Sequence, residues 1–302
     1  RQSYGMLTIG HVPFLWVFLF YFMTGLWIWK KNGQNRHIRI SLAYVIMIIL
    51  IWIPMARRKS LAFLDVGQGD CFVADTKSGA IIFDGGSSSE DQVGRYRILP
   101  YMKYLGYQKI QIAVISHMDI DHYSGIKELL EMGKIKYLGL PEIPKDETMK
   151  KIIGIAKKRG TTIFYLSRGR QITTKDGSLK VLHPQKNSQM EKNAASLVMQ
   201  GKILGYRVLL TGDVEKEGEE ELLSEELERA DILKAAHHGS KNSTSNEFLQ
   251  KVQPKQTVIS CGKQNRYGHP HLETIHRLQT YRTKIYRTDR SGAIIFFKRR
   301  DG

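Results

Sequence analysis

The stretch SHMDIDH at residues 116–122 constrains this chain most, because four potential metal ligands occupy six consecutive positions. It directly follows the apolar residues 110–115, whose composition is typical of a buried strand. A strand that ends in such a cluster presents carboxylates and imidazoles together at the rim of a sheet, where a cation can bind them. A polar turn with one Asp capping the next helix would explain one carboxylate, but not two flanked by imidazoles. The stretch therefore predicts a metal site.

The chain has 302 residues and a formal net charge of +17. This charge favours an anionic partner such as nucleic acid, an acidic membrane surface or a phosphorylated substrate, without distinguishing among them. Cys71 and Cys261 lie far apart, outside any CxxC spacing, and are expected to be buried thiols. A disulfide between them stays open. Because the first residue is Arg1, we expect the chain to be part of a longer protein.

Residues 12–29 and 40–56 are two apolar stretches without a charged side chain. Each approaches the ~20 apolar residues needed to cross a bilayer, and each is bordered by basic residues and tryptophans. A signal peptide is disfavoured because the basic cluster follows the first stretch instead of preceding it. We therefore expect residues 1–56 to form a transmembrane helical hairpin that ends a larger membrane domain. Loop charges slightly favour a cytoplasmic connecting loop, which would place everything after Arg57 outside the cell.

Residues 57–302 alternate between short apolar strands and amphipathic helices, which indicates one α/β domain. Helices are expected to start near Gln92, Tyr123, Asp146, Glu215, Ser245 and His271. Strands are expected at residues 61–66, 71–75, 80–84, 110–116, 135–140, 161–166, 179–184, 195–200, 206–212, 231–237, 257–261 and 292–297.

Three further motifs share the layout of residues 116–122, with polar residues where an apolar strand stops. They are Asp84 followed by two glycines, Asp213 after residues 206–212, and the pair His237-His238 after residues 231–236. Taken singly, each has an ordinary explanation as a turn, a helix cap or exposed histidines. Their common position at strand ends favours one shared metal site.

These motifs resemble the metallo-β-lactamase superfamily, whose HxHxDH signature appears here as HxDxDH. The resemblance is closer to the C-terminal domain of the ComEC family of DNA-internalisation competence proteins. The resembling motifs are LDVGQGD at 64–70, IIFDGG at 81–86, SHMDIDHYSG at 116–125, NAASLV at 193–198, LLTGDV at 209–214, HHGS at 237–240 and NRYGHPH at 265–271. The resemblance implies a four-layer αβ/βα sandwich with two divalent metals at one edge, preceded by a transmembrane helical hairpin.

Carried over by resemblance, the metal ligands divide into two sets joined by Asp213. Asp84 would orient a ligand histidine from behind, and His238 would replace His237 if that side chain faces away, since neighbouring strand residues point to opposite faces. The first metal would be bound by His117 and Asp119, the second by Asp121, His122 and His237, and Asp213 would bridge both.

Two departures from the superfamily pattern affect the first metal. Asp119 stands where many members have a histidine, and the third histidine has no clear counterpart, since Asn193 begins the corresponding stretch. His183 is the nearest candidate, although an ordinary loop role suits it better. The first site is therefore rich in oxygen, which shifts preference from zinc toward manganese or magnesium and predicts a labile metal.

Two divalent metals ~3.5–4 Å apart suit phosphodiester hydrolysis, with a hydroxide held near Asp213 and Asp121. His269 or His271 is the candidate acid for the leaving group, although Pro270 between them is also typical of a helix start. The turn-forming glycines of the LDVGQGD motif leave a purely structural role open, in which Asp65 or Asp70 satisfies backbone donors. Candidate contacts to the substrate backbone are Ser240, Lys241, Thr244, Lys263, Asn265 and Arg266.

By resemblance, the chain is a membrane-tethered nuclease that degrades the DNA strand not taken up during natural transformation. Its partners would be DNA, the membrane channel domain of the same full-length protein and other competence proteins. The alternatives are an extracytoplasmic phosphodiesterase or esterase acting on a small molecule or envelope polymer, and a DNA-guiding domain with little catalysis.

Overall fold

The computed structural model describes residues 10–29, 41–46, 58–190, 193–225 and 227–299. The chain divides into two compact units, one up to Arg58 together with Lys103–Gln108, the other comprising Lys59–Met102 and Lys109–Gly302. The second unit contains every candidate site residue and is called the domain below.

The first unit contains helix α1 (Phe14–Trp29), which covers most of the first apolar stretch, and a short helical segment at residues 41–46. Most of the second apolar stretch, residues 40–56, lies outside the described residues. Among the residues that the structure describes, no helix combines the length and the apolar character needed to cross a bilayer. The expected transmembrane hairpin therefore stays a prediction.

The domain is built on two seven-stranded sheets. The first has the strand order β14-β1-β2-β3-β4-β5-β6 and the second has the order β13-β12-β11-β10-β9-β8-β7. The first sheet comprises β1 (Ser60–Phe63), β2 (Phe72–Thr76), β3 (Gly79–Phe83), β4 (Ile110–Val114), β5 (Ile135–Pro141), β6 (Thr162–Leu166) and β14 (Ile294–Phe297). The second comprises β7 (Gln171–Thr174), β8 (Gly177–His183), β9 (Val198–Ile203), β10 (Tyr206–Leu210), β11 (Ile232–Lys234), β12 (Gln256–Ile259) and β13 (Lys284–Arg287).

The sequence analysis missed strands β7 and β13, because their sequences QITT and KIYR lack an apolar run. Each is the outermost strand of the second sheet and pairs on one side only. An edge strand buries few side chains, so its pattern is weak in the sequence.

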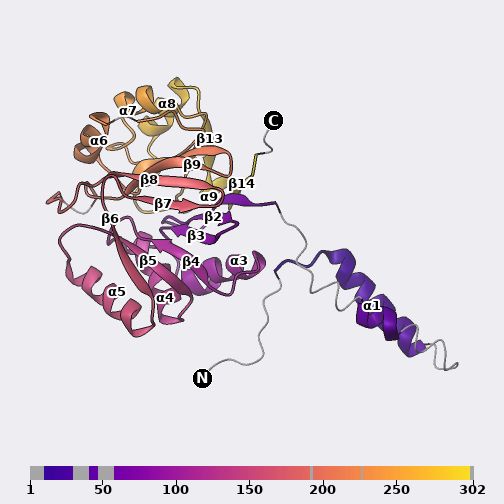
Figure 1. The fold of residues 1–302 in the computed structure, drawn as a ribbon. Helices are drawn as coiled ribbons and strands as arrows, with labels where there is room; N and C mark the ends of the chain where they lie inside the picture. The colour runs from indigo at the N-terminus through magenta and orange to yellow at the C-terminus, as the bar shows by residue number, and fades with distance from the viewer. Residues whose placement is uncertain (1–9, 30–40, 47–57, 191–192, 226, 300–302) are drawn as a thin grey trace. The chain divides into compact units, whose positions relative to one another are not determined.

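Helices cover the outer faces of both sheets, so that Figure 1 shows four layers. Two helices begin at side-chain caps expected from the sequence: Asp146 accepts a hydrogen bond from the Met149 amide and Ser245 accepts one from the Phe248 amide. The helices of the domain are α3 (Leu99–Tyr104, whose last two residues are assigned to the first unit), α4 (Ile120–Glu131), α5 (Glu147–Lys158), α6 (Lys216–Leu223), α7 (Asn246–Val252), α8 (Leu272–Thr280) and α9 (Thr288–Ser291), with a π-helix at Gly94–Ile98 and a 3₁₀ turn at Ala236–Gly239.

Two apolar cores hold the layers together. One lies between the sheets and includes Phe63, Leu179 and Val208, and the other joins the second sheet to α6, α7 and α8. Removing these side chains from water is the main term that stabilises such a sandwich. Cys71 and Cys261 are free and buried, as the sequence suggested. The predicted α/β sandwich is confirmed.

Strand direction decides where the site lies. Strands β3 to β6 run parallel, as do β10 to β13. Strand β1 is antiparallel to β2, which is antiparallel to β3, so β1 runs in the same direction as β3. We call the side of the domain where β1, β3, β4, β10, β11 and β12 end the carboxyl edge, and the opposite side, where these strands begin, the amino edge.

Candidate metal centre

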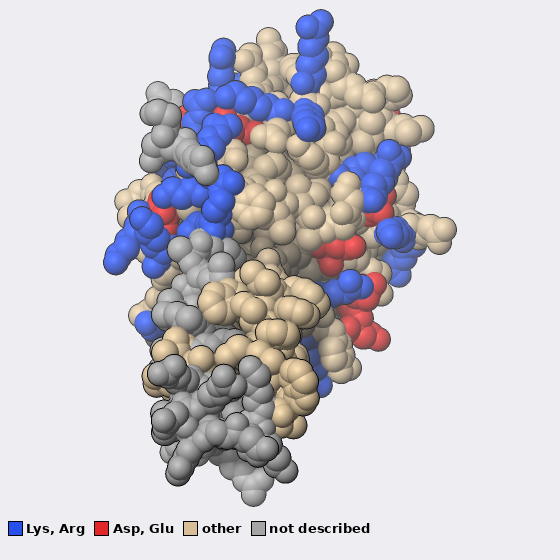
Figure 2. Space-filling model, turned by 90° about the vertical axis from the view of Figure 1, so that its right-hand side faces the viewer, with Lys and Arg blue, Asp and Glu red and all other residues tan. Residues whose placement is uncertain are grey.

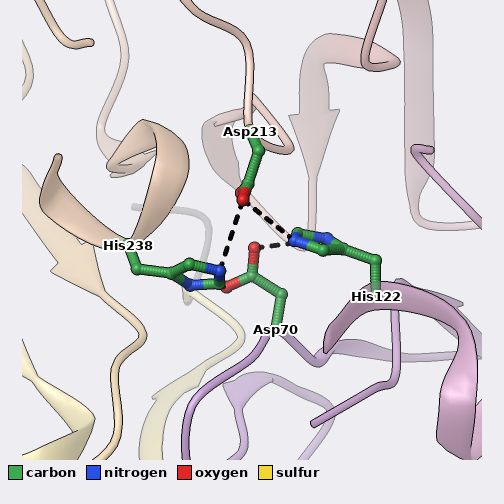
Figure 3. A group of neighbouring side chains, drawn as sticks. All are labelled: Asp70, His122, Asp213 and His238. Atoms are coloured by element: carbon green, nitrogen blue, oxygen red, sulfur yellow. Dashed lines mark ion pairs between the residues drawn. The ribbon is translucent and has the colours of Figure 1, made fainter. Parts of the chain in front are cut away.

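Four buried side chains converge at the carboxyl edge (Figure 3). One ligand atom from each lies within 4.8 Å of the others. Two of these residues follow strands of the first sheet and two follow strands of the second sheet. The site therefore forms only when the two sheets pack together. The four are Asp70, His122, Asp213 and His238.

His122 lies in the first turn of α4 and is oriented from behind by Asp84. The His122 Nδ1 atom is 3.0 Å from Oδ2 of Asp84, whose other oxygen accepts a hydrogen bond from the Ser116 amide at 2.7 Å. A buried carboxylate accepts hydrogen bonds, so Nδ1 carries the proton. The lone pair of a neutral His122 is then on Nε2, the atom that faces the centre of the site.

His238 is oriented in the same way by a backbone carbonyl. Its Nδ1 atom donates to the Ser260 carbonyl at 2.9 Å, which again leaves the lone pair on Nε2. The Nε2 atoms of His122 and His238 lie 3.1 and 3.3 Å from the same oxygen, Oδ2 of Asp213. Asp121 Oδ2 is 3.3 Å from Nε2 of His238.

These donor atoms fit one divalent cation. Lone pairs on nitrogen and oxygen repel one another at 3.1–3.3 Å unless a metal or a proton lies between them. Two ligands with bonds of ~2.1 Å at a tetrahedral angle are about 3.4 Å apart, close to the spacing observed. The Nε2 atoms of His122 and His238 are buried without a hydrogen-bond partner, as ligand atoms awaiting a metal would be.

His117 and Asp119 form a second, poorer set of donors beside the first. Nε2 of His117 is 3.7 Å from Asp119 Oδ2, and the rings of His117 and His122 are 4.1 Å apart between centroids. In the stretch that begins at Asn193, where the resemblance would place the third histidine, the Ser196 hydroxyl accepts a hydrogen bond from the Asp213 amide at 3.3 Å. The second set is thus an imidazole and a half-exposed carboxylate next to Asp213.

His237 contacts the site from its rim and is not one of the four converging residues. Its Nε2 is 3.9 Å from Asp213 Oδ2, and its Nδ1 is 2.9 Å from Glu215. Strand β11 ends at Lys234, and His237 and His238 follow in a tight turn with φ of 47° and 52°. Both side chains therefore lie near Asp213, because the alternation of a strand no longer applies there.

Lys234 and Asp70 complete the buried site. The Lys234 ammonium forms an ion pair with Asp70, donates to the Gly212 carbonyl at 2.9 Å and lies 3.4 Å from Oδ1 of Asp213. Asp70 lies 3.7 and 3.5 Å from the Nδ1 atoms of His122 and His238, whereas Asp213 lies against their Nε2 atoms. Although Asp70 belongs to the cluster of four, it is better placed to support the histidines than to share a metal with them.

Two glycines allow the loops to meet closely at the start of α4. A Cβ atom on Gly86 would lie 2.5 Å from the His122 amide nitrogen, and one on Gly69 would lie 2.2 Å from the Gly86 carbonyl oxygen. The Asp70 amide donates to the Asp121 carbonyl at 3.0 Å across this contact. The glycines of the GQGD and DGG motifs thus let Asp70 and Asp84 reach the two sides of His122.

Charges within the site perturb its pKa values strongly. Burial opposes protonation of His122 and His238, but the negative charge of Asp213 outweighs burial and holds the pKa values of both histidines well above the usual range. The charge of Asp84 adds to this effect at His122, and the charge of Asp70 adds to it at His238. Burial, reinforced by the charge of His122, lowers the pKa of His117 to about 3. Without metal, protons therefore take the place of a cation between Asp213 and its two histidines.

A cleft of about 260 Å³ opens above these residues. His269 lines it, stacked on Tyr267 with ring centroids 5.7 Å apart, and the Arg266 guanidinium lies 4.9 Å from the centre of the Tyr267 ring. Burial, together with the charges of His238 and His237, lowers the pKa of His269 to about 4. The walls are Gln68, Asp119, Ile120, Asp121, Asp213, His237, His238, Tyr267 and His269.

The candidate substrate contacts divide into exposed and buried residues. Lys241, Lys263 and Arg266 are exposed, whereas Ser240 and Thr244 are buried. The Thr244 hydroxyl accepts a hydrogen bond from the Ala236 amide, and the Ser240 hydroxyl accepts one from the Asn242 amide. Both hydroxyls therefore form hydrogen bonds within their own loop, residues 236–244. Asn265 likewise ties its own loop together through Gly262 and His269, and the His271 Nδ1 atom accepts from the Lys241 amide at 3.1 Å.

His183 is fully buried and engaged elsewhere. Its Nε2 donates to the Ala194 carbonyl at 2.7 Å, and its Nδ1 is 2.6 Å from Glu221 on α6. Both ring nitrogens therefore have partners outside the four-residue cluster. His183 supports the loop that begins near Asn193 and does not supply the missing ligand.

The part of the sequence that carries the ligand motifs matches a known protein family. The family model described as the metallo-beta-lactamase superfamily matches residues 64–263. The matched residues include the motifs from LDVGQGD at 64–70 to HHGS at 237–240. The chain belongs to the metallo-β-lactamase superfamily. The whole NRYGHPH motif, at 265–271, lies just beyond the matched residues.

Similar curated proteins carry this metallo-β-lactamase domain within longer chains. ComE operon protein 3 of Bacillus subtilis is 35% identical over 90% of this chain, and competence protein ComA of Neisseria gonorrhoeae is 30% identical over 79%. These matches confirm the resemblance to ComEC-family competence proteins. The chain spans only 38% and 32% of the lengths of those two relatives.

Solved structures share the metallo-β-lactamase fold at low sequence identity. The fold protein YhfI of Bacillus subtilis matches 78% of this chain and 99% of its own with a TM-score of 0.54 and 12% identity. The diiron β-hydroxylase CmlA of Streptomyces venezuelae matches 91% of this chain and 59% of its own with a TM-score of 0.51 and 10% identity. These two matches establish the fold alone.

Two residues of the metallo-β-lactamase site escaped the sequence analysis as functional residues. Lys234 is a lysine inside the apolar run 232–236, and Asp70 closes the LDVGQGD motif just after an apolar strand. A lysine at a buried strand position is rare unless it is paired, which is the signal that was available in the sequence.

Proposed function

We propose that this metallo-β-lactamase domain is a metal-dependent phosphodiesterase that cleaves DNA. In this proposal it degrades the strand that is not taken up during natural transformation, and it is attached to the membrane by the apolar residues that precede it. The observation that carries the proposal is the convergence of Asp121, His122, Asp213 and His238 with their acceptor atoms facing one another. Such a set can bind a divalent cation in place of the protons between Asp213 and the histidines, and the cleft above it is open to a substrate.

The residues present would hold two divalent ions of unequal affinity. Asp121, His122, Asp213 and His238 would hold the firmer ion, and His117 with Asp119 would hold the weaker one next to Asp213. A divalent metal supplies a hydroxide nucleophile and neutralises the attacked phosphate. Because Asp119 replaces a nitrogen donor by an oxygen donor, we favour manganese over zinc in the weaker position.

Exposed basic residues at the carboxyl edge would bind the DNA backbone. Lys241 and Lys263 lie on the loops that border the site, and Arg266 is held in place by the ring and hydroxyl of Tyr267. Contacts to phosphates alone give affinity without reading bases, which suits degradation of DNA of any sequence.

Two histidines of the NRYGHPH loop would serve the leaving group. His269 lines the cleft and, with its pKa lowered to about 4, is neutral near pH 7. The Nδ1 atom of His271 accepts a backbone hydrogen bond, which leaves its Nε2 as a donor when the ring is neutral. The rings are 4.9 Å apart, so one can bind the leaving oxygen while the other positions it.

The setting of the domain is proposed from its relatives and its sequence. The names of two relatives refer to competence or its operon, which supports a role beside the DNA-uptake machinery. The partners would be DNA, the channel domain of the same full-length protein and other competence proteins. The basic residues around the apolar stretches favour an extracytoplasmic domain.

A DNA-guiding domain with little catalysis is the second candidate. Lys234 supports it, because its ammonium already neutralises part of the charge of Asp70 and Asp213 and so reduces the need for a second cation. The two candidates differ in what Asp213 does. In a nuclease Asp213 is needed for turnover, whereas in a guide it is needed only for structure.

The test is cleavage of labelled single- and double-stranded DNA by the full chain with manganese, zinc or a chelator. The Asp213→Ala protein should bind DNA as the wild type does and cleave none of it with any metal. Exposed His276 on α8 offers a matched control, and His276→Ala should leave cleavage unchanged. Wild-type cleavage by Asp213→Ala would exclude the binuclear mechanism. Hydrolysis of small phosphodiesters without cleavage of DNA would favour an enzyme of the cell envelope instead.

A further inference from the structure

The amino edge of the second sheet carries a row of cations on neighbouring strands. Lys202 on β9 pairs in register with Arg207 on β10. Lys255 immediately precedes β12, and its carbonyl accepts a hydrogen bond from the amide of Lys284, the first residue of β13. Lys298 and Arg299 follow β14 and extend the row toward the first sheet. We call Lys202, Arg207, Lys255, Lys284, Lys298 and Arg299 the basic edge.

Among the residues that the structure describes, the ion pairs of the basic edge involve two carboxylates, Asp231 and Asp176. Asp231 is buried and is contacted by Lys255 at 2.9 Å, Arg299 at 3.4 Å and Arg207 at 4.0 Å. Asp176 lies 3.3 Å from Lys298. The six cations and these two carboxylates leave a surplus of four positive charges. Figure 2 looks onto the side of the domain that carries β14, and Lys and Arg side chains gather on it.

The basic edge is too far from the metal centre to hold the phosphate being cleaved. Arg207 and Asp213 lie near opposite ends of β10 and its following turn, six residues apart. At ~3.3 Å per residue of extended strand, the separation is at most roughly 20 Å, and longer than an arginine side chain reaches. The cations of the basic edge must therefore serve something other than the scissile phosphate.

The chain enters the domain at this same edge. Strand β1 begins at Ser60, and the Lys59 carbonyl accepts a hydrogen bond from the Lys298 amide at 2.7 Å. In the sequence, Lys59 follows Arg57 and Arg58, and these follow the uncharged apolar residues 40–56. Basic residues directly beside an apolar stretch of this length are typical of segments that contact anionic lipid headgroups.

We propose that the basic edge docks on the anionic phospholipid headgroups of a bilayer, the one to which the proposed function attaches the chain through its N-terminal apolar residues. Docking would set the amino edge against the membrane and turn the carboxyl edge, with its metal centre, away from it toward incoming DNA. The inference shares with the proposed function the assumption of membrane attachment, but it does not depend on nuclease activity. DNA as the occupant is disfavoured by the entry of the chain at Lys59, which brings the preceding apolar residues to this edge.

The test uses the full chain in nanodiscs of phosphatidylcholine alone or with phosphatidylglycerol. Hydrogen exchange is followed in the turns at this edge, residues 204–205, 253–255 and 282–283. Exchange should be slower in the anionic discs, and 0.5 M salt should remove the difference. Equal exchange in both kinds of disc would overturn the proposal, as would protection of these turns by added single-stranded DNA in neutral discs.

Charge-reversal variants make the test specific. Lys202 and Lys284 are exposed and are not the cations that contact Asp231, so Lys202→Glu with Lys284→Glu should leave the fold intact. A lysine beside an anionic membrane strengthens binding about fivefold, so the docking constant should fall by at least about 25-fold. The control, Lys145→Glu with Lys216→Glu on the carboxyl side, changes the charge equally and should retain protection. Retained protection in the first variant would overturn the proposal.

DNA cleavage measured on the same nanodiscs separates this inference from the proposed function. Lys202→Glu with Lys284→Glu should cleave DNA at the wild-type rate, because the metal centre is at the other edge. Protection in anionic discs without any cleavage by the wild type would reject the nuclease and keep the docking surface. Cleavage of DNA without protection of the turns would reject the docking surface and keep the nuclease.

Discussion

The Lys234 ammonium lies 3.4 Å from one carboxylate oxygen of Asp213, while the other oxygen of that carboxylate faces the Nε2 atoms of His122 and His238. Lys234 also donates to the carbonyl of Gly212, the residue before Asp213. The lysine therefore fixes both the backbone and the orientation of Asp213. Oδ2 of Asp213 stays available for a metal ion, whereas Oδ1 is paired with the Lys234 ammonium.

Replacing Lys234 by methionine should strongly destabilise the metal-free protein. Asp70 and Asp213 hold the pKa of Lys234 above its usual range against the opposing effect of burial, so the ion pair is charged. Removing one partner of a buried pair costs about 3–5 kcal/mol, because the remaining charges are left uncompensated. Urea unfolding measures the change. Lys127→Met, which breaks an exposed pair with Glu131, should cost less than about 1 kcal/mol, and equal losses in the two variants would refute the role given to Lys234.

Substituting Asp84 by asparagine should weaken metal binding while the fold persists. An amide in place of the carboxylate no longer holds the proton on Nδ1 of His122 as firmly, so the lone pair on Nε2 is less well oriented. Loss of such a supporting group typically reduces metal affinity about 10–100-fold. Competition with a chelator measures the affinity for Mn²⁺. Asp146→Asn at the start of α5 is the control, and an unchanged affinity in Asp84→Asn would contradict the prediction.

The stabilisation that a metal provides should grow as the pH rises. In the metal-free protein the pKa values of His122 and His238 are raised, so their contribution to stability is complete below the unfolded value of ~6.5 and is lost as the pH rises through the folded values. A metal requires both rings to be neutral, with Nε2 unprotonated, and it competes less with the protons on Nε2 at higher pH. The melting temperature is measured with and without Mn²⁺ from about pH 6 to about pH 9, and an increment independent of pH would show that no protons are displaced.

Replacing Asp119 by histidine should shift the metal preference from manganese toward zinc. The Asp119 carboxylate lies 3.7 Å from Nε2 of His117, so an imidazole there would add a nitrogen donor that zinc accepts readily. Relative cleavage of DNA with Mn²⁺ and Zn²⁺ is the readout, supported by metal binding measured in the absence of DNA. Ile120→Val on the adjacent position is a control for the loop, and the prediction fails if both variants keep the wild-type ratio.

The sequence by itself located the strand ends and much of the chemistry. His117, Asp121, His122 and Asp213 stand directly after apolar strands, and a strand's end is a local property that needs no knowledge of its neighbours. Parallel strands bring such ends to one edge, so the α/β pattern already implied that these residues belong to one region. The superfamily motifs added the order of the ligands.

Tertiary structure alone decided which histidine faces the centre and what supports it. His237 and His238 are adjacent in sequence, and only the left-handed turn after β11 and the Ser260 carbonyl across the next strand place His238 inside. Lys234 and Asp70 are 164 positions apart and meet because the two sheets pack face to face. A side chain's partners across a sheet interface depend on the register and packing of both sheets, whereas its place at a strand end depends on its own segment.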